Sequence, residues 1–199
     1  MTALLWAGAG AAVAFVVVFL LDGLTRPGYR PVRHPVSALA LGDRGWLQTT
    51  NFIVCGLLIT AAAPALPAQL GSVPLAVVVG FFGLALVASG VFPMDPMRGY
   101  PPGTPEGTPT EVSRRHQLHD HAGAAVFTAL PVASLVATFA LPGPLWTWFS
   151  GAVTVALFGG FHAFGQAWEN DSARLGLIQK LVITLGWSWL ALLFVHAAT

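Results

Sequence analysis

Residues Val73–Phe92 read VPLAVVVGFFGLALVASGVF, twenty residues without a charged side chain. A helix needs about 20 predominantly apolar residues to cross the hydrocarbon core of a bilayer. Five further stretches of this kind bring the predicted spans to Leu4–Leu21, Leu47–Leu66, Val73–Phe92, His121–Leu141, Leu145–Ala167 and Leu175–Ala197. We therefore expect an all-α, polytopic membrane protein, a bundle of six transmembrane helices in a single domain over residues 1–199.

The composition supports the same fold class. Only 9% of the residues are charged, 55% are hydrophobic, and the mean hydropathy is +0.72, whereas a soluble domain carries about 25% charged residues. The apolar runs are continuous and lack the alternation of barrel strands, which favours helices. Leu4–Leu21 lacks a basic leading segment and is followed by Asp22, so we interpret it as a retained span. The single cysteine, Cys55, excludes an intrachain disulfide and zinc sites built from several cysteines.

The charges are expected on one side of the bundle. All nine Lys and Arg and all eight Asp and Glu occupy or border the first, third and fifth links, and the two other links have none. Because positively charged loops remain inside, these links are predicted to face the cytoplasm, with both termini outside. The sequence has no basic patch with interleaved aromatic residues, so it does not predict a nucleic-acid partner. Tryptophans near the predicted span ends are expected to form an interfacial belt: Trp46, Trp146, Trp148, Trp168 and Trp187.

The densest group of candidate functional residues is the run RHQLHDH at Arg115–His121. In a helix, His116 and His119 share a face, so both imidazoles can hold one metal ion. Asp120 can orient one of these histidines. The alternative is a polar helix start whose histidines lie among lipid headgroups, and an HxxH pair alone does not decide between the two.

The first and third links offer residues that would complete such a site. His34 can add a third imidazole, which is the usual catalytic zinc pattern with an open position for water, or it can contact headgroups. Ser37 can cap a short helix or stabilise an oxyanion. Asp95, at the end of the third span, is either an interfacial cap or a group that binds the metal or holds an imidazole in one tautomer.

Two further features border the same face. His162 lies inside the fifth span with Gln166 one turn further, and an ionisable residue at this depth is a functional candidate unless a neighbouring helix simply binds it as a neutral imidazole. The link Gly99–Thr110 contains a GTPEGTP repeat that cannot be a regular helix. It is either a flexible linker or a loop that covers the site.

Several strings carry a resemblance to a known family, in order along nearly the whole chain. They are RPGYRPVRHPVS at Arg26–Ser37, Trp46 with Asn51 and Phe52, FPMDP at Phe92–Pro96, GYPPGTP at Gly99–Pro105, and HQLHD at His116–Asp120. With these strings the chain resembles the bacterial domain-of-unknown-function 998 membrane family. The resemblance implies a six-helix protein of the bacterial cytoplasmic membrane.

A looser resemblance is to the membrane hydrolase superfamily of the alkaline ceramidases and adiponectin-type receptors. That superfamily holds zinc with three histidines, with Asp and Ser nearby, among seven helices. The resemblance implies matching roles for His34, Ser37, Asp95, His116 and His119. This chain departs from the pattern, because it has six predicted spans and its histidine pair is HxxH at the fourth span rather than HxxxH near the last.

Three functions follow as hypotheses. The first is a zinc-dependent hydrolase of a lipid or amphipathic substrate, in which His34, His116 and His119 hold the metal and Ser37, Asp95 and Asp120 assist the metal-bound water. The second is a transporter or lipid-binding protein, in which Arg30, Arg33, Arg98 and Arg115 hold an anionic headgroup and His162 and Asp95 are proton-coupled groups. Gln166, beside His162, is a further candidate for substrate binding. The third is a b-type haem protein with axial histidines drawn from His34, His119 and His162. The sequence leaves the oligomeric state open.

Overall fold

The computed structural model describes residues 1–199 and contains helices but no strands. Its α-helices are α1 (Thr2–Thr25), α2 (Gly45–Ala62), α3 (Leu66–Leu70), α4 (Val73–Val91), α5 (Arg114–Ala140), α6 (Pro144–Glu169) and α7 (Leu175–Ala198). Two short 3₁₀ helices complete the chain, η1 (Val36–Ala40) in the first link and η2 (Ala63–Ala65) between α2 and α3.

Six helical stretches are long and apolar enough to cross a membrane: α1, α2 continued through α3, α4, α5, α6 and α7. The predicted six-helix membrane bundle is therefore confirmed, and the protein is a multi-pass membrane protein. The fourth span begins at Arg114, seven residues before the predicted His121, because Ser113 caps α5 by accepting the N–H of His116. His116 and His119 thus lie within the first turns of α5.

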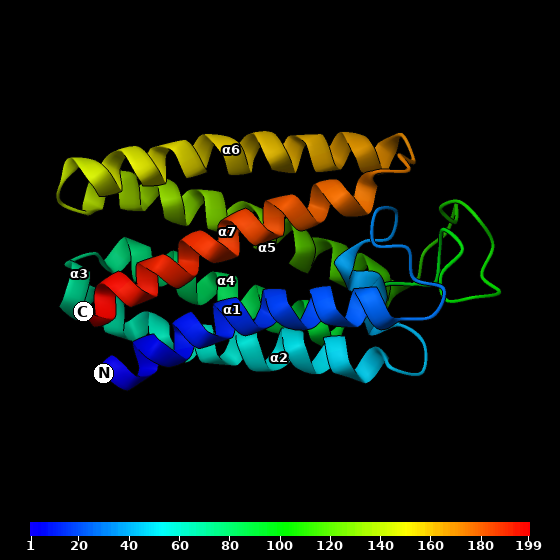
Figure 1. Cartoon of the computed structure of the whole chain (residues 1–199), viewed down its shortest axis with the longest axis horizontal. Helices are drawn as coiled ribbons and strands as arrows, with labels where there is room; N and C mark the ends of the chain where they lie inside the picture. Colours follow the sequence, from blue (N-terminus) through cyan, green and yellow to red (C-terminus); the bar gives the residue numbers. More distant parts are fainter.

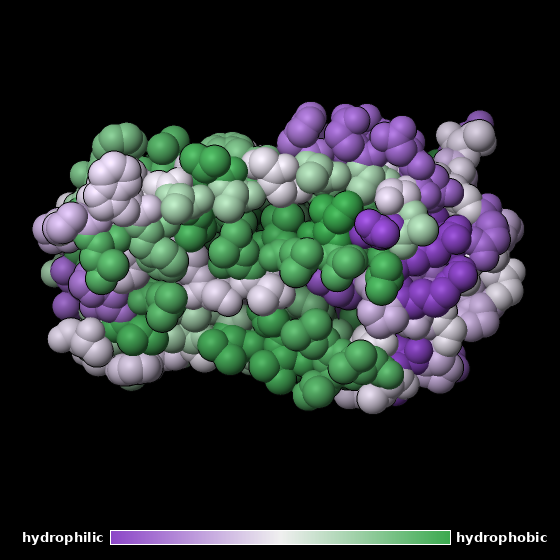
Figure 2. All heavy atoms as spheres, turned by 45° about the horizontal axis from the view of Figure 1, so that its top comes forward, coloured by the Kyte–Doolittle hydropathy of each residue, from purple (hydrophilic) through white to green (hydrophobic).

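The six spans form a closed ring in which each packs against two neighbours. The order around the ring is α1, α2, α4, α5, α6 and α7, and α7 returns to α1. Two links are long, residues 26–44 between α1 and α2 and residues 92–113 between α4 and α5. Figure 1 shows these long links gathered at one end of the bundle, with both termini at the other end. Hydrophilic residues crowd the end with the long links and hydrophobic residues cover the middle (Figure 2), as the charge pattern of the sequence predicts.

Trp187 is the centre of the core rather than part of an interfacial belt. Its ring stacks on Phe15 with centroids 4.1 Å apart and meets Phe82 edge-on at 5.2 Å. Only 1% of its surface is exposed, because α7 turns this residue toward the middle of the ring. The belt prediction is therefore wrong for Trp187, whereas Trp46 and Trp148 are exposed near helix ends.

Glycines set the closest helix contact. A Cβ added at Gly56 of α2 would lie 2.7 Å from the backbone oxygen of Gly83 in α4. These two helices therefore touch backbone to backbone, which is the usual purpose of small residues between membrane helices. The tight α2–α4 contact anchors one side of the ring, next to α5.

Candidate functional site

Ser37 lies in η1, and α7 holds this part of the first link in place. Lys180 donates from Nζ to the backbone oxygen of His34 at 2.8 Å. Gln179 accepts the N–H of Val36 on its Oε1 at 2.7 Å. Buried backbone groups outside regular helices need such partners, so the two polar side chains of α7 allow an irregular segment to lie inside the bundle.

Ser37 and His119 form a hydrogen-bonded pair between this link and α5. Ser37 Oγ lies 2.9 Å from His119 Nε2. On the other edge of the imidazole, His119 Nδ1 lies 2.7 Å from the backbone oxygen of Phe92 and 3.1 Å from that of Ser89. Carbonyl oxygens only accept, so Nδ1 carries the hydrogen of the neutral imidazole and Nε2 accepts the Ser37 hydroxyl hydrogen. The backbone at the C-terminal end of α4 therefore fixes both the tautomer and the orientation of the His119 imidazole.

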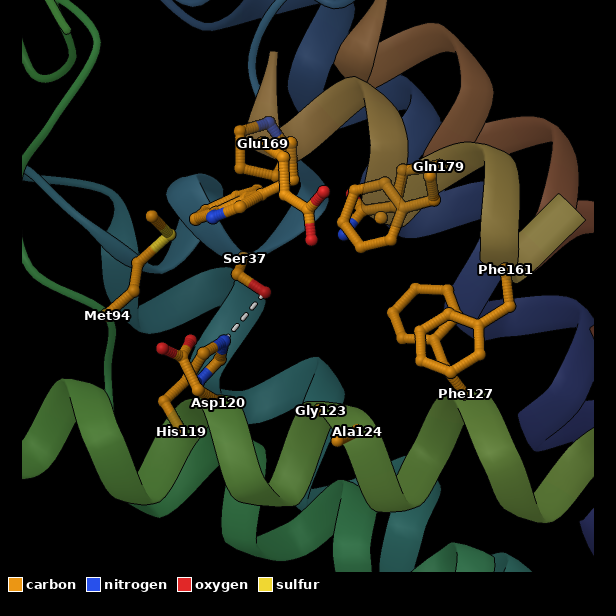
Figure 3. Close-up of a pocket in the computed structure, with 14 residues that line it drawn as sticks. Ser37, Met94, His119, Asp120, Gly123, Ala124, Phe127, Phe161, Glu169 and Gln179 are labelled. Carbon is orange, nitrogen blue, oxygen red and sulfur yellow. Dashed lines mark hydrogen bonds between the residues drawn. The ribbon is translucent and has the colours of Figure 1, made fainter. Parts of the chain in front are cut away.

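The pair lies in the wall of a pocket of about 240 Å³ (Figure 3). Polar side chains surround the pair at one end, and the stacked rings of Phe127 and Phe161, with centroids 5.4 Å apart, form the other end. The lining residues are Pro35, Ser37, Met94, His119, Asp120, Gly123, Ala124, Phe127, Phe161, Phe164, Gly165, Trp168, Glu169 and Gln179. The pocket is thus amphipathic, with its reactive groups at the polar end.

The three histidines predicted to share a zinc ion have separate partners. Both ring nitrogens of His34 face backbone groups of the links. His116 accepts the N–H of Asp95 on its Nδ1 at 2.8 Å, while His119 binds Ser37. Zinc needs several lone pairs that converge on one point, and no group of three His, Cys, Asp or Glu side chains comes together in this way. The residues therefore do not fit the zinc site that the sequence suggested.

Asp95 and His116 fix the start of α5 instead of flanking a metal. The carboxylate of Asp95 accepts the N–H and the Oγ–H of Ser113 at 2.6 and 2.7 Å. Burial opposes ionisation, but the two hydrogen bonds from Ser113 outweigh it and hold the pKa of Asp95 below its ordinary value. His116 Nε2 lies 3.3 Å from Asp120, which faces the pocket one turn further along the helix.

Ser113→Ala is expected to destabilise the protein by about 1 kcal/mol, the usual cost of losing an N-cap side chain. The variant loses the cap to the His116 N–H and one hydrogen bond to Asp95. Unfolding in detergent, followed by circular dichroism, measures the change. Ser172→Ala, in the last link, serves as the control, and an equal loss in both variants would contradict the cap.

His34 is buried as a neutral imidazole that joins the first and third links. Its Nδ1 accepts the N–H of Arg30 at 2.9 Å, so Nε2 carries the hydrogen and donates to the backbone oxygen of Arg98 at 3.1 Å. Burial lowers the pKa of His34 most, and the charges of Arg30, Arg33 and Lys180 lower it further. This histidine supports the fold of the links and does not face the pocket.

Acidification is expected to weaken the fold through His34. Since its folded pKa lies below the ordinary value of 6.5, its contribution to stability is complete above that pH and is lost as the pH falls toward the folded pKa. His34→Gln keeps one donor and one acceptor without a titrating ring, so its melting temperature should fall less than that of the wild type between about pH 7.5 and about pH 5. Exposed His121→Gln is the control, and equal pH slopes for His34→Gln and the wild type would refute the assignment.

The link Gly99–Thr110 packs on the first link rather than over the pocket. Glu106 pairs with Arg30 at 3.2 Å and with Arg33 at 2.7 Å. No residue of Gly99–Thr110 lines the pocket. Arg30 and Arg33 therefore tie two links together at the polar end, instead of offering a basic site to an anionic headgroup.

Arg98 and Arg115 also lie outside the pocket. The Arg98 guanidinium is buried over the ring of Trp168, 4.5 Å from its centroid, and donates to the Trp168 backbone oxygen at 2.9 Å. It also lies 2.8 Å from the carboxylate of Asp171. Arg115 is exposed in the first turn of α5. Arg98 thus positions Trp168, a pocket residue, without reaching the pocket itself.

His162 and Gln166 lie on the outer face of α6, where both are exposed. They line a shallow hollow of about 380 Å³ that shares Phe161, Gly165 and Glu169 with the pocket. His34 is buried in the links and His119 binds Ser37, so these three histidines face different surroundings. The structure does not pair them across one cavity as a haem with two axial histidines requires.

Residues 9–196 match the family model described as "Protein of unknown function (DUF998)". The chain belongs to this family. The predicted membership is confirmed over nearly the whole sequence. No curated protein and no solved structure matches the chain significantly.

The pocket of this DUF998 protein contains residues that the sequence patterns did not single out as a site. Phe161, Phe164 and Trp168 recur at helical spacing on α6 and place their rings along one wall. In a sequence, such a stripe is typical of core packing. Only the structure shows that these rings line a pocket. Gln179 of α7 also belongs to this group of pocket residues, and its contact with η1 joins segments 143 residues apart.

Proposed function

We propose that this protein is an integral-membrane hydrolase that cleaves an ester in a lipid or other amphipathic substrate, with Ser37 as nucleophile and His119 as general base. The observation that carries the proposal is the 2.9 Å contact between Ser37 Oγ and His119 Nε2 in an amphipathic pocket. A serine hydroxyl is a weak nucleophile until an adjacent base takes its proton. The substrate class is the one that the sequence suggested. The nucleophile differs, because the Ser37 hydroxyl takes the place of the zinc-bound water.

The acylation step uses the tautomer that the backbone imposes on His119. Nε2 takes the hydroxyl proton as Ser37 Oγ forms a bond to the substrate carbonyl carbon. The tetrahedral intermediate collapses when the bond from that carbon to the leaving oxygen breaks. The leaving alkoxide takes the proton from Nε2 and departs as an alcohol, and the acyl group remains on Ser37.

Water completes the cycle by the same route. His119 takes a proton from the water as the water oxygen forms a bond to the acyl carbon. The bond to Ser37 Oγ then breaks, the proton returns to Ser37, and a carboxylic acid leaves. The carbonyl oxygens of Phe92 and Ser89 stabilise the imidazolium during both steps, because they accept the hydrogen of Nδ1 throughout.

Two donors beside Ser37 are available for the developing oxyanion. The backbone N–H of Ser37 has no acceptor within the protein. Gln179 uses its Oε1 to accept the N–H of Val36, and its amide N–H groups have no protein acceptor while the residue lines the pocket. Preorganised donors of this kind stabilise acyl-transfer transition states by about 2.7–4 kcal/mol each.

The proposed orientation places the pocket at the cytoplasmic face of the bacterial inner membrane, with both termini outside. The concentration of Lys and Arg on the links at the pocket end supports this orientation. The substrate would then be drawn from the cytoplasmic leaflet or delivered from the cytoplasm.

A fluorophosphonate probe tests the nucleophile without knowledge of the substrate. We expect the purified protein in detergent to be labelled at Ser37, as mapped by mass spectrometry, and Ser37→Ala to be unlabelled. Labelling should persist after treatment with a metal chelator, because no step depends on zinc. Absence of label on Ser37 in folded wild-type protein would overturn the proposal, and loss of label on chelation would return zinc to the mechanism.

A further inference from the structure

The pocket is bounded on two sides by neighbouring helices that separate toward the polar end. α5 and α6 each contribute five of its 14 lining residues. Figure 1 shows these helices converging at the turn that joins them and diverging toward the long links. α6 is also the least buried span, with 22% of its most apolar window buried. The pocket therefore borders the most peripheral helix of the bundle.

The aromatic end of the pocket lies well inside the apolar layer. Phe127 follows the first residue of α5 by thirteen positions, which is about 20 Å at 1.5 Å per residue. Phe161 precedes the end of α6 by eight positions, or about 12 Å. The rings thus lie at the depth of lipid acyl chains, whereas Ser37 lies at the end with the charged links.

Two glycines that line the pocket face open space between the two helices. A Cβ added at Gly123 of α5 or at Gly165 of α6 would meet no atom within 4 Å. In contrast, Gly56 and Gly83 are needed for helix contact, since a Cβ there would collide with backbone. Exposed Ala124 lines the gap beside Gly123, so the pocket reaches the outer surface of the bundle between α5 and α6.

The polar rim of the gap is acidic. Asp120 and Glu169 line the pocket, and no Arg or Lys does. Gln166 lies within 3.4 Å of Glu169 and, with His162, extends the polar surface along the outer face of α6. Exposed polar side chains on a membrane helix are costly against hydrocarbon, and a lipid headgroup or its water would satisfy them. Two carboxylates favour a cationic group and disfavour an anionic one.

We infer that the substrate is a membrane-resident acyl lipid with an ammonium-bearing headgroup, and that it reaches Ser37 sideways from the bilayer between α5 and α6. Its acyl chain lies against Phe127, Phe161 and Phe164, and its ammonium group lies near Asp120 and Glu169. This inference rests on the proposed hydrolase function and adds the class of lipid and the route of access.

Blocking the gap tests the route. Gly165→Leu should lower hydrolysis of phosphatidylethanolamine in vesicles by at least about tenfold, since even one methylene in a pocket is worth about 10- to 200-fold. Its thermal unfolding in detergent should stay close to that of the wild type, because a Cβ at Gly165 would meet no atom within 4 Å. Gly159→Leu is the matched control, as it lies on the same helix, also has open space around its Cβ, and does not line the pocket. Equal lipid hydrolysis by both variants and the wild type would overturn sideways access.

A second experiment tests the headgroup preference by comparing hydrolysis rates on two lipids. Wild-type protein should prefer phosphatidylethanolamine over phosphatidylglycerol, and Glu169→Gln should reduce this preference. A preference for phosphatidylglycerol in the wild type would overturn the assignment of an ammonium headgroup. Equal rates on the two lipids would also overturn it.

A photoreactive lipid separates failure of this inference from failure of the hydrolase proposal. Phosphatidylethanolamine with a diazirine in one acyl chain should crosslink to the pocket segments of α5 and α6, 120–127 and 161–169, and Gly165→Leu should lose these adducts. Adducts spread over the other spans, together with normal fluorophosphonate labelling of Ser37, would overturn the inference alone. Adducts confined to the gap without any labelling of Ser37 would overturn hydrolysis and keep the lipid site.

Discussion

Ser37→Ala and His119→Ala are each expected to lower ester hydrolysis by at least about 10²- to 10⁴-fold, the range that a positioned general base contributes. Ser37→Ala removes the attacking oxygen, and His119→Ala removes the only side chain that accepts its proton. Because the two residues act as a unit, the double variant should be no slower than either single variant. Initial rates with p-nitrophenyl acetate measure the effect in detergent.

Histidine and serine variants outside the pair control for general damage. His121→Ala replaces an exposed histidine two residues from His119 on the same helix, and Ser172→Ala replaces a serine in the last link. Both should retain activity close to that of the wild type. If His119→Ala were as active as His121→Ala while remaining folded, His119 would not be the base.

Gly176→Ala is expected to produce a large structural effect from a single methyl group. The added Cβ would collide with the backbone oxygen of His34 and lie 2.7 Å from that of Pro31. Overpacking against backbone costs about 1–3 kcal/mol, more than the ~1 kcal/mol that alanine gains over glycine in a helix interior. The first link must then move away from α7, and the variant should lose both stability and hydrolytic activity.

Gly10→Ala is the matched control for this substitution. Gly10 also lies in a membrane helix, α1, but its Cβ would meet nothing within 4 Å. We expect its thermal unfolding in detergent to occur at or slightly above the wild-type temperature. A Gly176→Ala protein with wild-type stability and activity would show that the link is not seated tightly against α7.

The sequence alone determined the membrane fold and the end of the molecule that carries the polar residues. Uninterrupted apolar runs such as Val73–Phe92 leave no alternative to transmembrane helices, because unpaired backbone groups cannot face lipid. The segregation of all charges into alternate links likewise predicted which end is polar, and Figure 2 shows this end. Both inferences depend on composition along the chain, which is independent of how the helices pack.

Only the tertiary structure decided which of the polar residues act together. Ser37 and His119 are 82 residues apart, and their contact depends on Lys180 and Gln179 seating the first link against α7. The sequence grouped His119 with His34 and His116 by residue type. In the structure, backbone groups bind His34 and His116. Hydrogen bonds to the main chain leave no trace in side-chain spacing, so a histidine that supports a loop and one that faces a pocket look alike until the chain is folded.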